Sequence, residues 1–561
     1  MNKKTVTLLI LLAVMILAAV CFIKIDERNV VLTVESNGVP AILIRRDAYE
    51  VTARARRAEA DDVWVFILPA GMNDRVIYND MLSVPVTVDG RELQRFASFE
   101  WEEGRTYSLS FETDGERREL RARFETTSDI PSVFITTRNN DMEFVNNAKA
   151  NIESGKILVI EPDGSASYSG RLTFHGRGNS SFFLFDKKPF NVKLEKAGSL
   201  LGMKKDKDWV FLANAWDYSY MNNKLAFDIA EKAGFRYVPQ AEYADVWFNG
   251  EYWGLYLIAE KVEVDEERID VTDLKLKNQR MNPGVDLTLA EPFDTGARRG
   301  VKLESIPENI TGGYLIERDY RLQPDYPHRI MTPSYFETDA GTGFNIKSPE
   351  YADEREVEYI ANLTNELEQA ILSEDGTSPT GKSWLDYIDL TSWIRSYMVA
   401  EIAYDTDKDV TNAYYYKDTD AIDSKIYMGP VWDYDNRFGG HENDEDPEVL
   451  TKLAEEGWSQ RLYDRKEFLE AVHAEWQRFF GNYLKNEALP MIDQWQKQIE
   501  KSVSLDLIRW PRGEGYPVQW PTDTQDQDIR FTQTYDFDAE VNHLKTWLKT
   551  RTTFLDRIWN E

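Results

Sequence analysis

Two acidic segments in the last third of the chain constrain its fold more than any other feature. In EIAYDTDKDVTNAYYYKD, Asp407 precedes Asn412 by five positions. A strand-like stretch follows, and MGPVWDYDNRFGG then supplies Asp433 and Asp435. Protein kinases use this spacing for a catalytic Asp, which accepts a hydroxyl proton, and for an Asn and an Asp that hold magnesium. Because the chain contains 97 Asp and Glu residues, the spacing needs support from a phosphate-binding segment.

A glycine-containing segment upstream carries residue types that bind phosphate. The segment GRGNSS lies between two strand-like stretches, Arg171 to Phe174 and Phe190 to Leu194. Glycine lets the backbone bend close to phosphate oxygens, and the side chains of Arg177, Asn179 and Ser180 can bond to them directly. The simpler interpretation of a single short glycine motif is a hairpin with a tight turn.

Lys193 is a candidate for pairing with the phosphate. Apolar residues alternate in PFNVKL, so Lys193 shares a strand face with Asn191, opposite the apolar side chains. A Lys that points away from the core and toward a glycine turn can reach a phosphate. A solvated Lys is the simpler alternative.

Seven segments, taken in order, resemble one known family. They are RGNSSFFLFDKKPFNVKL (Arg177 to Leu194), KDWVFLANAWDYSYMNNKLAFDIA (Lys207 to Ala230), VWFNGEYWGLYLIAEKV (Val246 to Val262), GGYLIERD (Gly312 to Asp319), FNIKSPE (Phe344 to Glu350), the Asp407 segment and GPVWDYDNRFGG (Gly429 to Gly440). By these segments the chain resembles the CotH family, the spore-coat-protein-H-like atypical kinases. The resemblance covers roughly residues 130 to 445, and seven ordered matches are far more specific than any one of them.

The resemblance implies a kinase-like fold that binds ATP with Mg²⁺ or Mn²⁺ and phosphorylates Ser residues of secreted, envelope or spore-coat proteins. It implies that Asp407 is the catalytic aspartate and that Asn412 is the metal-side position after it. Asp433 and Asp435 match the metal-binding WD-x-D element of the family.

The resemblance also implies a nucleotide-binding set. Arg177 and Asn179, with the neighbouring Ser180, match the nucleotide loop. Either Lys188 or Lys193 would pair with the phosphates, and the sequence does not choose between them. Glu260 is a candidate acidic partner or adenine-side residue.

One position departs from the family pattern. The usual Arg-Asn after the Asp-x-Ser-x-x element reads Asn222-Asn223 in this chain. We therefore expect a basic contact near Asp217 to be missing, whereas the assignment of the other site residues is unaffected.

The N-terminus has the pattern of a membrane segment. Thr5 to Ile23 is apolar apart from two threonines and follows Lys3-Lys4, and about 20 residues cross a bilayer as a helix. Residues 1–28 are interpreted as an uncleaved signal anchor in preference to a cleaved signal peptide. The positive end stays in the cytoplasm, which predicts an extracytoplasmic location for the rest of the chain. The only cysteine, Cys21, lies inside the run, so the exported part contains no disulfide.

Residues 29–128 predict a β-sandwich, because short alternating runs are separated by turn residues. The runs are Val30 to Val34, Ala41 to Ile44, Val63 to Leu68, Val84 to Val88, Tyr107 to Phe111 and Leu120 to Phe124. Residues 129–561 form the kinase-like part, with a helical C-terminal region. Its predicted amphipathic helices are Glu356 to Leu372, Trp384 to Ala403, Arg465 to Phe480, Pro490 to Ser502 and Ala539 to Trp559.

The predicted fold class is therefore α+β: a kinase-like catalytic domain preceded by a β-sandwich domain and an N-terminal transmembrane segment. The net charge of −31 argues against nucleic acid as a partner, because nucleic-acid binding needs a basic face. The membrane, through residues 1–28, and a Ser-containing protein substrate are the expected partners.

Three functions compete at this stage. The leading hypothesis is an extracytoplasmic, membrane-anchored protein kinase. The second is a kinase-like scaffold without turnover in envelope or coat assembly, and the third is a glycosidase built from Asp407 and Asp433 or Asp435. A calcium loop through Asp405, Asp407 and Asp409 is a minor alternative, because the glycine and terminal glutamate of such a loop are absent.

Overall fold

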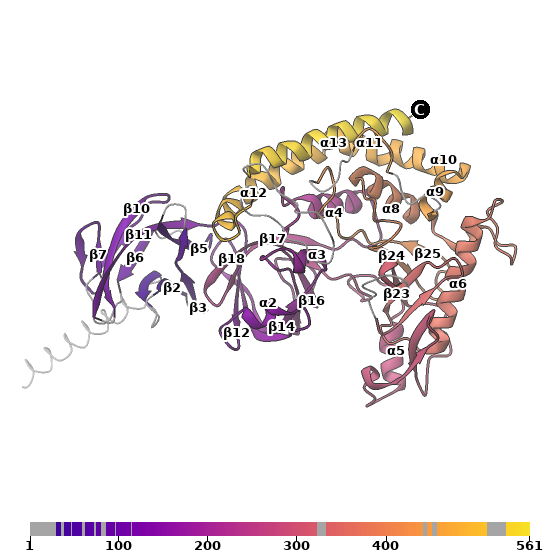
Figure 1. Cartoon of the computed structure of the whole chain (residues 1–561), viewed down its shortest axis with the longest axis horizontal. Helices are drawn as coiled ribbons and strands as arrows, with labels where there is room; N and C mark the ends of the chain where they lie inside the picture. Colours follow the sequence, from indigo (N-terminus) through magenta and orange to yellow (C-terminus); the bar gives the residue numbers. More distant parts are fainter. Residues whose placement is uncertain are drawn as a thin grey trace, which may run out of the picture.

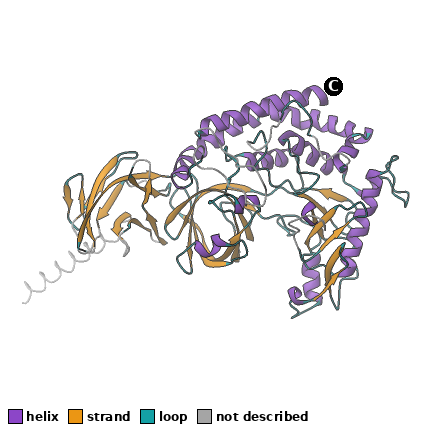
Figure 2. Cartoon of the chain, in the orientation of Figure 1, coloured by secondary structure: helices purple, strands orange, loops and turns teal. Residues whose placement is uncertain are grey.

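The computed structural model describes residues 30–560, apart from 35–38, 47, 59–61, 72–74, 80–85, 96, 114, 323–331, 441–445, 452–456 and 513–534. Three parts follow one another in space: a strand-rich module, a barrel and a larger lobe covered by helices (Figure 1). Strands dominate the first two parts, and the long helices lie over the barrel and the third part (Figure 2). Of the helices among the described residues, none has the length and apolar character needed to cross a bilayer. The predicted anchor, residues 1–28, lies outside the described residues.

The first module consists of two sheets that share one core. The five-stranded sheet has the order β3-β2-β1-β6-β9, and the six-stranded sheet has the order β4-β5-β11-β10-β7-β8. The strands are β1 (Val30–Val34), β2 (Pro40–Arg46), β3 (Tyr49–Arg54), β4 (Arg56–Ala58), β5 (Val63–Leu68), β6 (Val76–Asn79), β7 (Val86–Val88), β8 (Arg91–Leu93), β9 (Ser98–Glu100), β10 (Thr106–Thr113) and β11 (Glu116–Thr126). Alternation places apolar residues of both sheets inside, where Phe66 stacks on Phe124 with ring centroids 4.8 Å apart.

This first core continues into the rest of the chain. Trp247, Tyr252 and Leu505, from the barrel and a late helix, belong to the same apolar cluster. The indole of Trp247 stacks on Phe134 with ring centroids 4.6 Å apart. The strand-rich module is therefore packed against the barrel through buried apolar contacts.

The second part is a closed barrel with the strand order β12-β13-β14-β15-β16-β18-β17. Its elements are β12 (Ser132–Thr137), β13 (Glu153–Ile160), β14 (Ala166–Gly176), β15 (Phe190–Gly198), β16 (Asp206–Leu212), β17 (Ala241–Phe248) and β18 (Glu251–Glu260), with short helices α2 (Glu143–Asn147) and α3 (Ser180–Phe183). Asn249 and Gly250 join β17 to β18 with φ angles of 54° and 83°, as a two-residue hairpin with positive φ at both central positions requires. An Asn-Gly pair between two strand-like runs predicts a two-residue hairpin turn, and the pairing of β17 with β18 confirms it.

The third part contains a seven-stranded sheet with the order β19-β20-β22-β23-β21-β24-β25. Its strands are β19 (Glu291–Asp294), β20 (Arg298–Lys302), β21 (Tyr314–Arg318), β22 (Tyr335–Glu337), β23 (Gly343–Ser348), β24 (Ala413–Lys417) and β25 (Ile426–Met428). The helices are α4 (Asn222–Ala233), α5 (Leu274–Met281), α6 (Glu354–Leu372), α7 (Trp384–Tyr387), α8 (Leu390–Ala403), α9 (Trp458–Tyr463), α10 (Lys466–Glu475), α11 (Gly481–Asn486), α12 (Ala488–Arg509) and α13 (Phe537–Trp559). The mixed α+β class is confirmed.

The predicted helices are present with changed bounds. Helix α6 begins with a capping box between Asp353 and Glu356, two residues before the predicted start. The single helix predicted from Trp384 to Ala403 is wrong, because Ile388 is extended and Asp389 caps a second helix, α8. Polar capping residues inside an apolar stretch divide it into two helices.

A buried polar cluster attaches α12 to the barrel. The Asp506 carboxylate accepts hydrogen bonds from Lys187 Nζ at 2.7 Å, Tyr220 Oη at 2.7 Å and the Leu255 amide at 2.9 Å. A Cβ at Gly254 would lie 2.1 Å from Asp506 Oδ1, so the glycine permits this close approach. The late helix is thus bound to the barrel by a fully buried ion pair.

We expect Asp506→Leu to lower the free energy of unfolding by about 3–5 kcal/mol, because Lys187 would be left buried without its counter-ion. The double variant Lys187→Met/Asp506→Leu should regain part of this loss. Urea unfolding followed by circular dichroism measures both. Asp493→Asn on the same helix, which breaks a partly exposed pair with Lys545, is the control and should cost at most about 1 kcal/mol. Equal losses for Asp506→Leu and the control would contradict the role of the buried pair.

Candidate active site

A cavity of about 400 Å³ opens between the barrel and the third part of the chain. Both parts contribute to its wall. The lining residues are Lys149, Ala150, His175, Gly176, Arg177, Gly178, Asn191, Val210, Lys261, Val262, Lys347, Tyr414 and Trp432. Four of them are cationic, although the chain as a whole carries a net charge of −31. The cavity therefore suits an anionic ligand.

Residues 433–437, which carry Asp433 and Asp435 and which we call the carboxylate loop, begin at the cavity wall. Trp432 lines the cavity, and Asp433 follows it with a positive φ of 68°. Asn412 Nδ2 donates a hydrogen bond of 2.8 Å to Asp433 Oδ2. Arg177, on the opposite wall, has its guanidinium 5.3 Å from the centroid of the Trp432 ring. The structure thus brings Arg177, Asn412 and Asp433 to one place from three distant segments.

Asp407 belongs to the same group through Arg437. Arg437 Nη2 donates to Asp407 Oδ2 at 2.6 Å, and its Nε donates to Asp405 Oδ1 at 2.9 Å. The Asp407 side chain remains 46 % exposed, whereas that of Arg437 is only 8 % exposed. A buried cation therefore fixes an accessible carboxylate. Sequence reasoning did not single out Arg437, although it lies inside GPVWDYDNRFGG.

The two carboxylates of the WD-x-D element have raised pKa values. Burial raises the pKa of Asp433, while the charges of Arg177 and Arg437 lower it. Burial and the neighbouring charge of Asp433 raise the pKa of Asp435 well above its usual range. A cation near two adjacent carboxyl groups that resist ionisation stabilises their anionic forms. Together with Asn412, Asp433 and Asp435 offer the oxygen ligands that magnesium prefers.

Asn179 and Ser180 lie beside the cavity without lining it. Asn179 Oδ1 accepts a hydrogen bond from Lys149 Nζ at 3.0 Å, and Ser180 Oγ accepts one from Trp216 Nε1 at 3.3 Å. The segment between β14 and β15 contains the helix α3 and is not the tight turn that the simpler interpretation expected. Gly176, Arg177 and Gly178 line the cavity instead.

The structure does not bring Lys188, Lys193 or Glu260 to the cavity. Lys188 Nζ donates to the Phe182 carbonyl oxygen at 2.6 Å, and Lys193 Nζ lies 3.5 Å from Asp208. Glu260 is buried and accepts a hydrogen bond of 3.1 Å from the Gln240 amide. The strand-face alternation that made Lys193 a candidate is present, and Asn191 on that face lines the cavity, but Lys193 itself lies beside Asp208.

The cations that do line the cavity are Lys149, Arg177, Lys261 and Lys347. Lys347 Nζ lies 3.2 Å from Glu317 Oε2, so the cavity wall contains a Lys–Glu pair contributed by β23 and β21. Lys347 falls within FNIKSPE, one of the segments that resemble the family, so the sequence did contain a signal for this residue. Lys149 precedes the first of the matching segments, and nothing in the sequence distinguishes it from other surface lysines.

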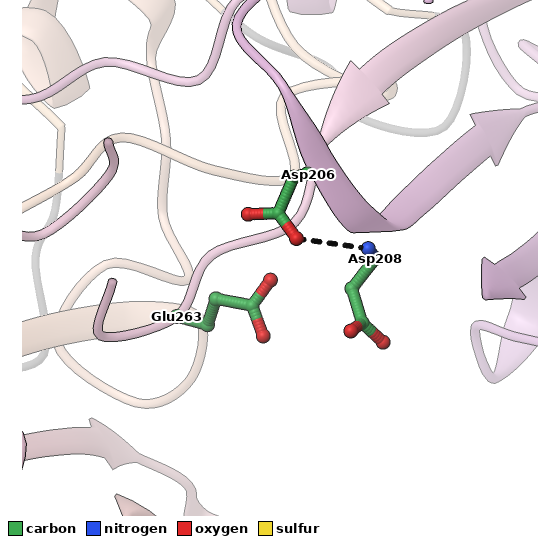
Figure 3. A group of neighbouring side chains, drawn as sticks. All are labelled: Asp206, Asp208 and Glu263. Carbon is green, nitrogen blue, oxygen red and sulfur yellow. Dashed lines mark hydrogen bonds between the residues drawn. The ribbon is translucent and has the colours of Figure 1, made fainter. Parts of the chain in front are cut away.

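The acidic cluster that meets Lys193 consists of Asp206, Asp208 and Glu263 (Figure 3). Its carboxylate oxygens lie within 4.8 Å of one another. Burial raises the pKa of Glu263 to about 7. Lys261 Nζ lies 3.7 Å from Asp208, and Arg268 donates to Asp206 at 2.7 Å. Basic side chains thus already balance this cluster, and we assign no metal to it.

The three aspartates of the alternative calcium loop are divided between two partners. Asp405 and Asp407 bind Arg437, whereas Asp409 Oδ1 accepts a hydrogen bond of 2.7 Å from Ser459 Oγ. Asp409 is buried at 1 % exposure, but Asp407 is accessible. Their carboxylates do not converge on one ion, which argues against the calcium loop.

Asn222 and Asn223, where the sequence departs from the family pattern, hold the carboxylate loop. Asn222 Nδ2 donates to the carbonyl oxygens of Asp435 at 3.2 Å and Arg437 at 2.8 Å. Asn223 Oδ1 accepts a hydrogen bond of 2.8 Å from the Tyr434 amide. Sequence reasoning missed this role, because the loop lies more than 200 positions away along the chain.

The Asp217 segment positions these two asparagines. Its carboxylate accepts hydrogen bonds from the Ser219 amide at 2.9 Å and the Asn222 amide at 2.7 Å, at the start of α4. Arg512 Nη1 donates to the Asp217 carbonyl oxygen at 3.0 Å. A basic contact near Asp217 is therefore present, and a residue from the C-terminal region provides it.

A family model described as CotH kinase protein matches residues 174–555. The match spans more than half of the chain, so the chain belongs to the CotH family, as its resemblance predicted. A search of curated proteins found no match. The family defines a kinase-like protein, and the site described above lies within the matched residues.

We expect Asn222→Asp to loosen the carboxylate loop, because the new carboxylate oxygen cannot donate to the two carbonyl groups. The free energy of unfolding should fall by about 1–3 kcal/mol, and trypsin should cleave after Arg437 faster than in the parent. Asn486→Asp on α11, whose Nδ2 donates to an exposed neighbour, is the matched control. Unchanged cleavage after Arg437 in Asn222→Asp would show that the amide does not hold the loop.

The Asp217 carboxyl predicts a pH dependence of stability. Burial raises its pKa from 3.8 to about 6, although hydrogen bonds from Ser219 and Asn222 favour the anion. Between pH 3.8 and about 6, the Asp217 carboxyl of the folded state retains a proton that the unfolded chain has released. The free energy of unfolding should therefore fall as the pH rises through the window, by on the order of 1–3 kcal/mol.

Urea unfolding of the parent and of Asp217→Asn at several pH values measures this contribution. Asp217→Asn should lose the part of the pH dependence of the free energy of unfolding that Asp217 contributes. The control variant Asp538→Asn, at an exposed position, should keep it. Parallel curves for the parent and Asp217→Asn would contradict the raised pKa.

Proposed function

We propose that the protein is an atypical protein kinase that transfers the γ-phosphate of ATP to a Ser hydroxyl with Mg²⁺ or Mn²⁺. One observation carries the proposal: a cavity lined by four cations adjoins a group formed by Asp407, Asn412 and Asp433. Membership of the CotH family supports the same reaction class. A glycosidase needs two carboxylates facing a sugar site, and the cationic lining does not favour one.

The residues present fit a nucleotide with a divalent metal ion. Lys149 and Arg177 offer positive charge for the phosphates, and Lys261 and Lys347, which are also paired with acidic side chains, add to it. Asp433 and Asp435 would hold the metal with Asn412, which donates to Asp433. When bound, the metal neutralises charge on the phosphate oxygens.

Asp407 is the proposed base. Because Arg437 occupies one of its oxygens and the side chain is 46 % exposed, the carboxylate is oriented and still reachable by a substrate hydroxyl. The Ser oxygen forms the new bond to the γ-phosphorus, the bond from that phosphorus to the β–γ bridging oxygen breaks, and ADP leaves. The hydroxyl proton passes to Asp407.

The proposed location is extracytoplasmic, with the chain anchored through residues 1–28. Lys3-Lys4 before the apolar run supports this orientation. The expected substrates are Ser residues of secreted, envelope or spore-coat proteins. Added protease should digest the folded part in intact protoplasts, and its protection there but not after lysis would contradict this location.

Incubation with labelled ATP and Mg²⁺ or Mn²⁺ tests the reaction, with label on the protein itself or on a Ser-rich peptide as the readout. Asp407→Asn should abolish transfer but preserve the rise in melting temperature that ATP and metal produce. Asp433→Asn should weaken that rise as well, because it removes a metal ligand. Exposed Asp538→Asn is the control.

The outcomes separate the hypotheses. A melting-temperature shift without transfer in the parent would favour the kinase-like scaffold. Transfer that survives Asp407→Asn undiminished would show that another aspartate is the base. The absence of any shift at millimolar ATP with either metal would contradict nucleotide binding.

A further inference from the structure

Three large apolar side chains are exposed on the two barrel segments that border the cavity. Phe144 is 47 % exposed, Ile152 63 % and Phe183 60 %. Phe144 belongs to α2, Ile152 follows the turn after it, and Phe183 ends α3; both helices lie on the barrel (Figure 1). We call these three residues the apolar rim. Single exposed apolar residues are ordinary, but three of them on two short segments that also supply cavity-lining residues indicate an interaction site.

Lys149 connects the apolar rim to the cavity. Its Nζ donates to the Gly178 carbonyl oxygen at 2.8 Å and lies 5.9 Å from the centroid of the Phe183 ring. Lys149 and Gly178 both line the cavity. Two positions after Lys149, Asn151 Nδ2 donates to the Phe144 carbonyl oxygen at 2.7 Å. Through Lys149, the Phe183 end of the rim adjoins the cavity wall.

The outward position of Phe183 follows from the packing of its neighbour. Phe182 is buried at 2 % exposure against Gly176, where an added Cβ would lie 2.1 Å from the Phe182 ring. Consecutive side chains on a helical turn point about 100° apart. Burying Phe182 thus leaves Phe183 exposed, and the glycine loop that forms the cavity wall imposes this arrangement.

The apolar rim also lies near the loop that carries Asp407. Burial lowers the pKa of Lys149, and the nearby charges of Arg321 and Arg177 lower it further. The Tyr320 amide, next to Arg321, donates to the Val410 carbonyl oxygen at 2.9 Å. Tyr320 and Arg321 thus link the Lys149 segment to the Asp407–Val410 turn. A polypeptide whose hydroxyl reaches Asp407 would pass beside the rim.

We propose that the apolar rim binds the polypeptide substrate and accepts one bulky apolar side chain near the phosphorylated Ser. This inference rests on the proposed kinase function. The position of Phe183 beside the cavity wall favours a substrate segment over a second copy of the chain or a membrane surface, because neither of those needs to meet the catalytic carboxylate. The rim thereby selects substrates by a flanking apolar residue.

The test uses the full chain and two pools of Ser-containing peptides that differ at one fixed position near the Ser, which is Leu in one pool and Gly in the other. The parent should phosphorylate the Leu pool with a KM about tenfold lower, as burial of one large apolar side chain allows. Phe183→Ser should remove this preference by raising KM, with kcat and the KM for ATP unchanged. Ile422→Ser, at a 70 % exposed position in the turn between β24 and β25, is the matched control.

Failure of this inference is distinct from failure of the proposed function. If the parent binds ATP and phosphorylates both pools equally, and Phe183→Ser does the same, the apolar rim is not a substrate site. Phe183→Ser could instead keep the preference for the Leu pool and differ from the parent in oligomeric mass or in binding to anionic vesicles. That result would assign the rim to a second copy or a membrane and overturn the proposal. Ile152→Ser provides a second variant should Phe183→Ser fail to fold. No ATP binding and no transfer in the parent would instead contradict the kinase itself.

Discussion

A single guanidinium, that of Arg437, holds together the acidic groups on which the site depends. It donates to Asp405 at 2.9 Å and to Asp407 at 2.6 Å from a side chain that is only 8 % exposed. Its charge also lowers the pKa of Asp433 and of Asp435, against the effect of burial. Without this cation, four neighbouring carboxyl groups would repel one another or take up protons, and neither state suits a base or a metal ligand.

The position of Arg437 explains why three parts of the chain meet at this loop. The Asn222 side chain, at the start of α4, binds the Arg437 carbonyl oxygen, and the Phe438 amide donates to Ala403 at the end of α8. Helix α8 leads directly into the turn that carries Asp407. The barrel contributes the opposite wall through Arg177, and Asp506 on α12 ties the late helices to the barrel. The cavity exists because these separately positioned elements converge.

Local patterns allowed much of the fold to be predicted, but not the partners of the side chains. The Asn-Gly hairpin and the capped helix α6 follow from backbone geometry and capping, which depend on neighbours in sequence. Lys193, one of the two candidate lysines, lies beside Asp208 and not in the cavity lining, because strand alternation gives the face of a side chain and not what lies opposite that face. Lys149 and Arg437 act on segments far away along the chain, and a single sequence carries no signal for such contacts.

Hydrogen exchange of the full chain with and without ATP and Mg²⁺ tests the central claim most directly, because it reports where the ligand acts. The account predicts slower amide exchange in three segments, 175–183, 407–412 and 431–438, and a smaller effect when Mg²⁺ is replaced by a chelator. Protection confined to other parts of the chain, or none in these three segments while ATP is bound, would contradict a nucleotide–metal site at this cavity.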